Sequence, residues 1–115
     1  MAKLSDETLG TIFTLQRQLV EGMDEAAATE SRLFEQFGET EETLPVLEQL
    51  LNVRERLLAP YSRLSALLPR ISEYQPTAPT DVVNLLYQTI EQAQAARDAS
   101  IASIREAKRD FDLHE

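Results

Sequence analysis

Apolar residues recur at helical spacing along most of the chain. Between Asp6 and Phe37 they keep one seven-residue frame for more than four repeats, which predicts an amphipathic helix over residues 6–37. Ser5 is a suitable N-cap for this helix, and Gly38 is a natural residue just past its end. The predicted apolar stripe has three rows: Leu9, Gln16, Met23, Glu30 and Phe37; Ile12, Leu19, Ala26 and Leu33; and Phe13, Val20, Ala27 and Phe34.

The same pattern predicts a second helix over residues 44–74, which contains Pro60 and Pro69. An interior proline costs about 3 kcal/mol and removes a hydrogen bond, so two shorter helices are one interpretation. However, the frame passes Pro60 without a change of phase, and a chain that broke and restarted would have no reason to keep it. We therefore favour one long helix kinked at Pro60. Its rows are Leu47, Arg54, Tyr61 and Leu68; Leu50, Leu57, Leu64 and Ile71; and Leu51, Leu58 and Ser65.

A third helix is predicted over residues 80–110. It follows residues 75–79, which contain two prolines and should end the second helix. Thr80 is its expected cap, and Asp81 lies in its first turn. Its stripe is thinner and rich in alanine: Val83, Ile90, Arg97, Ile104 and Phe111; Leu86, Ala93, Ser100 and Ala107; and Tyr87, Gln94 and Ile101. Three helices of similar length joined by short turns must run up-down-up. We thus expect an all-α fold, a single domain over residues 1–115 that forms an elongated, antiparallel three-helix bundle.

Charge and composition narrow the classes of partner. The net charge of −9 argues against nucleic acid and against anionic membranes, because both attract basic surfaces. No stretch approaches the roughly 20 apolar residues needed to cross a bilayer, and the first residues lack the apolar region of a signal peptide. A cytoplasmic location is the expectation that follows.

Residue types needed for most enzymatic chemistry are absent. The chain has no cysteine and one histidine, His114, so neither a catalytic triad nor a zinc or di-iron site can be assembled. Acidic pairs one helical turn apart, such as Glu21 with Glu25 and Glu106 with Asp110, could hold a cation loosely, but a solvated face explains them better. We predict no catalytic residue, no metal site and no cofactor.

A fourth apolar row in the second helix widens its stripe beyond what two partners within a bundle need. This row comprises Val46, Val53, Leu67 and Tyr74. One interpretation is that the second helix is central and the row belongs to the core. The other is a second interface, used by a homodimer or a partner helix.

Polar residues interrupt the first row of each helix: Gln16, Glu30, Arg54 and Arg97. Counting residues from the end of the bundle that holds the first turn places Arg54 and Arg97 at nearly one level, with Glu30 roughly 9 Å away along the axis. They could form a buried polar layer that sets helix register or receives an anionic group. Alternatively, each arginine could extend to the surface and cover apolar neighbours with its stem.

The leading functional hypothesis is a non-enzymatic interaction protein, such as an adaptor, a chaperone or an assembly subunit, that forms a homodimer through its second helix. A small-molecule or ion binder that uses the polar layer is the alternative. A protein that opens on a lipid surface is a third hypothesis, disfavoured because the expected basic face is missing.

Overall fold

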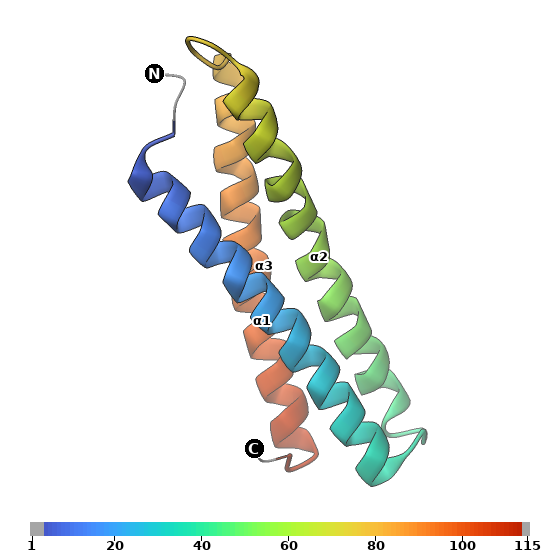
Figure 1. Ribbon diagram of the computed structural model, residues 1–115. Coiled ribbons are helices and arrows are strands. Elements are labelled where there is room, and N and C mark those ends of the chain that lie inside the picture. The colour runs from blue at the N-terminus through green and yellow to red at the C-terminus, as the bar shows by residue number, and fades with distance from the viewer. Residues whose placement is uncertain (1–3, 114–115) are drawn as a thin grey trace.

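Three long helices form the molecule, as predicted. The computed structural model describes residues 4–113, of which 85% are helical. The helices are α1 (Asp6–Phe37), α2 (Leu44–Glu73) and α3 (Thr80–Asp110). Figure 1 shows α2 running against α1 and α3, with α1 inclined across α3. All three pack against one another in a rod with extents of 57 × 22 × 17 Å.

Helix ends follow the capping residues, with one exception. The Ser5 side chain accepts a hydrogen bond from the backbone N–H of Thr8 at 3.1 Å, and Gly38 adopts a φ of 67° beyond the last turn of α1. At the start of α3 the expected cap is wrong. Pro79 occupies the N-cap position and Thr80 is the first helical residue, without a side-chain cap.

The turn between α1 and α2 is organised by Thr43, which is buried. Its hydroxyl group donates to the carbonyl oxygen of Gly38 at 2.7 Å and accepts from the backbone N–H of Thr40 at 2.8 Å. Gly38 is the C-cap of α1, whose carbonyl oxygen has no intrahelical partner, and Thr40 lies in the turn itself. Thr43 therefore closes the turn that sets α1 and α2 side by side.

Helix α2 continues without interruption past Pro60 and Pro69, so the preference for one helix over two is confirmed. It ends one residue earlier than predicted, because Tyr74 is already extended, with φ −78° and ψ 124°. Pro60 is buried between helices. Its ring thus adds apolar contact at a position where the helix loses one hydrogen bond.

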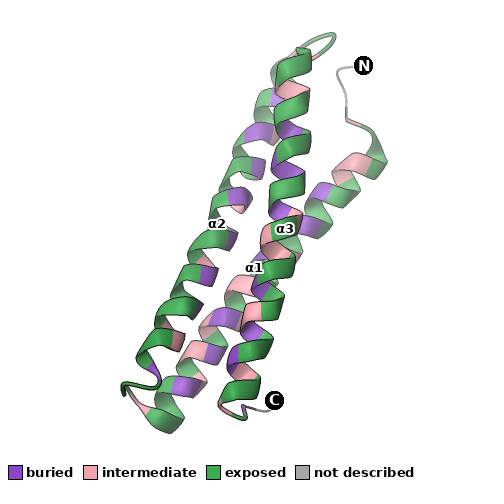
Figure 2. Ribbon diagram, turned by 180° about the vertical axis from the view of Figure 1, so that it is seen from behind, coloured by how far each residue is buried: buried purple, intermediate pink, exposed green. Residues whose placement is uncertain are grey.

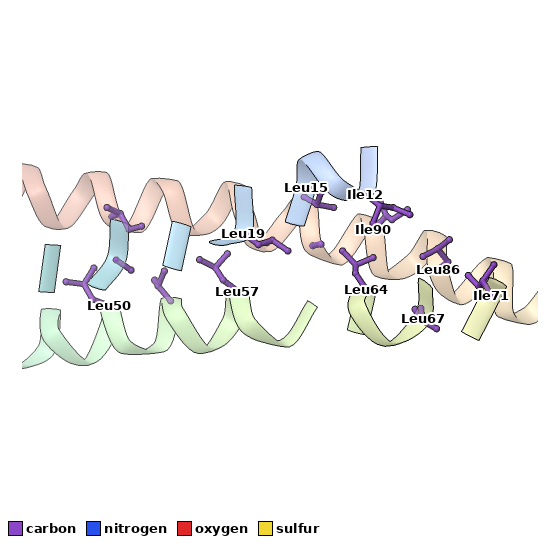
Figure 3. Packing of buried hydrophobic residues seen from close by; sticks show 14 of the residues in the cluster. Ile12, Leu15, Leu19, Leu50, Leu57, Leu64, Leu67, Ile71, Leu86 and Ile90 are labelled. Carbon is purple, nitrogen blue, oxygen red and sulfur yellow. The ribbon is translucent and has the colours of Figure 1, made fainter. Parts of the chain in front are cut away.

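The core runs the whole length of the rod, between the inner faces of the helices (Figure 2). In Figure 3 the labelled leucine and isoleucine side chains point from all three helices into the space between them. The second predicted row of each helix is correctly placed, for example Leu19, Leu57 and Leu86, which are fully buried. The third row is not core, because Phe13 and Leu58 are more than half exposed. Each helix is thus rotated away from the orientation that the sequence suggested.

Small residues explain this rotation in α1. On the face opposite Phe13 stand Leu15, Gly22 and Thr29, and a Cβ atom added to Gly22 would lie only 2.9 Å from Leu57. Thr29 can be fully buried because its hydroxyl group donates to the carbonyl oxygen of Glu25 at 2.8 Å. Close approach through small residues therefore turns the phenylalanines outward.

Candidate protein-interaction groove

The fourth apolar row of α2, for which a second interface was one interpretation, does not form one exposed surface. Val53 and Leu67 belong to the core of the chain, with exposed fractions of 2% and 5%. Val46 is half-buried and packs against that core, and Tyr74 is half-buried at the end of the helix. In this conformation Val53 and Leu67 leave almost no surface for a second protein, so these two residues belong to the core.

Exposed apolar surface lies instead on the rows that were expected to be buried. On α1 and α2 these large side chains recur mostly at intervals of seven residues: Phe13, Val20 and Phe34 on α1, and Leu44, Leu51 and Leu58 on α2. Their exposed fractions range from 43% for Leu44 to 57% for Phe13. A seven-residue repeat keeps them on one face of each helix, as in a coiled-coil seam.

At the end of the rod that holds the first turn, this surface is hollowed into a groove of about 420 Å³ between α1 and α2. Half of the ten residues that line it are apolar, and they come from both helices. They are Ala27, Phe34, Leu44, Leu47 and Leu51. Glu30 and Arg54 lie in the same lining and form an ion pair at 3.1 Å, with both side chains partly exposed.

A second groove, of about 430 Å³, lies toward the other end of the same two helices. Leu9 and Phe13 of α1 line it together with Leu68 of α2. Between the grooves, the side-chain amide of Gln16 donates to the hydroxyl oxygen of Ser65 at 2.9 Å. Neither groove is lined by a described residue of α3. We call this continuous surface the α1–α2 face.

The polar residues of the first rows do not form a single layer. Arg54 reaches Glu30, whereas Arg97 donates to the side-chain oxygen of Gln18 at 2.7 Å and to Asp98 at 3.0 Å. Glu30 and Gln18 are twelve residues apart on α1, or ~18 Å along its axis. Arg54 and Arg97 therefore share no partner on α1.

In the acidic pair on α1, Glu21 and Glu25, each carboxylate has a basic neighbour from the same chain. Glu25 forms an ion pair with Lys108, and Glu21 lies 3.6 Å from Arg17. Among residues 4–113, no group of three or more His, Asp or Glu side chains is placed to hold a metal ion. In the same range, every buried side-chain nitrogen or oxygen has a hydrogen-bond partner. His114 lies outside the described residues.

None of the helices between residues 4 and 113 is both long enough and apolar enough to span a membrane. No protein-family model, curated protein or solved structure matches the chain.

Proposed function

We propose that the protein is a non-enzymatic helical interaction protein, such as an adaptor, a chaperone or an assembly subunit, which binds a helix of a protein partner on its α1–α2 face. The observation that carries this proposal is the pair of exposed apolar rows, represented by Phe34 on α1 and Leu51 on α2. Large contiguous apolar surface on a soluble protein usually marks a site of interaction. A groove between two helices accepts the apolar stripe of a third.

The exposed rows also lie where a fourth helix would complete a four-helix bundle. Helix α3 occupies one side of the α1–α2 pair, through contacts such as Arg63 with Gln92 and Lys108 with Glu25. The α1–α2 face lies on the other side of that pair. A helix placed there would bury both rows and give the four-helix packing that is common in bundles.

The alternative, a small-molecule or ion binder, has less support. It relied on a shared polar layer, and Arg54 and Arg97 contact different residues of α1. Both guanidinium groups already have partners within the chain, so neither presents an unsatisfied buried charge to a ligand.

Site-specific photo-crosslinking in the native host tests the proposal. A photoreactive amino acid at Leu58, on the α1–α2 face, should crosslink to one defined protein, and the Phe34→Glu substitution should abolish this crosslink. The same photoreactive residue at Tyr87 of α3, which is 48% exposed, is the matched control. Equal crosslinking from both positions, or a product that survives Phe34→Glu in a folded variant, would contradict the proposal.

A further inference from the structure

We propose that the occupant of the α1–α2 face is a basic amphipathic helix of another protein, and not a second copy of this chain. This inference rests on the proposed function and specifies the chemistry of the partner. It follows from the length of the apolar rows, from the charges beside them, and from how those charges are already paired.

The length of the rows fits a single long helix. Phe13 and Phe34 are separated by 21 residues, or ~32 Å of helix. A partner helix of about six turns would span both grooves, with apolar side chains at every third or fourth position entering the space between α1 and α2. A much shorter segment would leave one of the two grooves uncovered.

Acidic side chains border the apolar rows. On α2, Glu48 and Glu55 each lie one helical turn beyond a leucine of the exposed row, and both are exposed. Asp24 holds the equivalent position beyond Val20 on α1. Asp6 contributes to the lining of one groove and Glu39 to that of the other.

Two basic side chains lie along this face, and each has an acidic neighbour. Arg54 is paired with Glu30 inside one groove, and Arg17, one turn beyond Phe13, lies 3.6 Å from Glu21 in a solvent-exposed pair. Acidic side chains therefore outnumber basic ones along the rows, whereas the groove between α1 and α3 is lined by three bases, Arg97, Arg105 and Lys108, and by two acids, Glu21 and Glu25.

This distribution of charge selects the occupant. Lysine or arginine side chains on either side of a partner's apolar stripe would reach the carboxylates of Asp24, Glu48 and Glu55. A second copy would instead bring its own acidic rims against the first, and like charges placed together oppose association. The full chain adds to this repulsion through its net charge of −9.

Two synthetic helical peptides of 21 residues test the inference directly. They share one apolar stripe and differ only in the residues that flank it, which are lysine and arginine in one and glutamate in the other. We expect fluorescence anisotropy to show saturable binding of the basic peptide, weakened by salt, and binding at least about tenfold weaker for the acidic one. A basic peptide with a scrambled apolar stripe should not bind.

Variants of the chain separate groove binding from general attraction between opposite charges. Leu51→Glu adds negative charge but removes an apolar contact, so it should weaken binding of the basic peptide, whereas non-specific attraction would be strengthened. Replacing Glu48 and Glu55 together by lysine should reverse the preference toward the acidic peptide. Glu91→Lys, an exposed acidic position on α3, is the matched control and should leave the preference unchanged.

The possible failures are distinguishable. Equal binding of the two peptides, both lost with Leu51→Glu, would overturn the basic character of the partner and leave the proposed function intact. A homodimer by sedimentation that Phe34→Glu dissociates would identify a second copy as the occupant. Binding that is insensitive to Leu51→Glu and Phe34→Glu would remove the α1–α2 face from both proposals.

Discussion

Individual residues decide how closely the helices approach one another, and the glycines of α1 make this measurable. Gly10 has open space around it, whereas a Cβ atom at Gly22 would meet the side chain of Leu57. Alanine in a helix is favoured over glycine by about 1 kcal/mol. We expect Gly10→Ala to stabilise the protein by roughly that amount and Gly22→Ala to stabilise it less or to destabilise it, as measured by urea unfolding. An equal gain at both positions would show that α1 and α2 do not pack closely at Gly22.

Thr43 gives a second prediction at this scale. Thr43→Val keeps the volume of the side chain but leaves the carbonyl oxygen of Gly38 and the backbone N–H of Thr40 without its hydroxyl group. Loss of a buried hydrogen-bonding group of this kind costs about 1–3 kcal/mol. We expect a destabilisation in that range by thermal or urea unfolding. Thr14→Val, at an exposed position within α1, measures the effect of valine on a helix alone and should cost clearly less.

At the scale of the element, the sequence predicts the three helices and their bounds well, because hydrophobic period and capping residues are local properties. The rotation of each helix is not local. A hydrophobic pattern favours Phe13 over Thr29 as a core residue, yet Thr29 is buried and Phe13 exposed. What decides between them is the close contact of Gly22 with Leu57, which involves two helices. The spacing of Gly22, Ala26 and Thr29 on α1 was the available signal.

The prolines of α2 provide the prediction for this scale. Each lies inside a continuous helix, but Pro60 is buried and Pro69 is exposed. Replacing either by alanine restores a backbone donor, which is worth up to about 3 kcal/mol in a helix interior. At Pro60 this gain is offset by the buried ring contacts that are lost. We therefore expect Pro69→Ala to stabilise the protein by about 1–3 kcal/mol in urea unfolding, and Pro60→Ala to stabilise it less. A larger gain at Pro60 would mean that its ring contributes little to the core.

At the candidate site too, the sequence predicts local features, whereas contacts between helices depend on how the helices pack. The rows place Glu30 and Arg54 among the polar residues that interrupt the apolar stripes, and the structure joins these two as an ion pair. The contacts of Arg97 with Gln18 and Asp98 could not be predicted from the rows, because the first of them depends on how α1 and α3 lie against each other. The sequence did not predict the α1–α2 face, and it did not decide whether Val53 and Leu67 are core residues. Both depend on which helix packs against each apolar row, and the period of a row does not contain that information.

On the scale of the whole molecule, the shape itself can be tested. The Cα radius of gyration is 17.4 Å, whereas a compact globular chain of this length would have one of about 13 Å. We expect small-angle scattering at moderate salt to give a value slightly above 17.4 Å, because side chains and hydration add to it, with the forward scattering of a monomer. A doubled forward scattering would indicate a stable homodimer. A radius near 13 Å would contradict the rod.

An odd number of antiparallel helices gives the rod a direction. The first helix begins in the half of the rod that holds the α2–α3 turn, and the last helix ends in the other half (Figure 1), so the described chain enters and leaves toward opposite ends of a body 57 Å long. Circular permutation would therefore need a long connecting peptide: an extended chain advances at most ~3.5 Å per residue, so the full 57 Å would take at least about 16 residues. Conversely, domains fused before α1 and after α3 would be held apart by the length of the rod, with the α1–α2 face left open along the side between them.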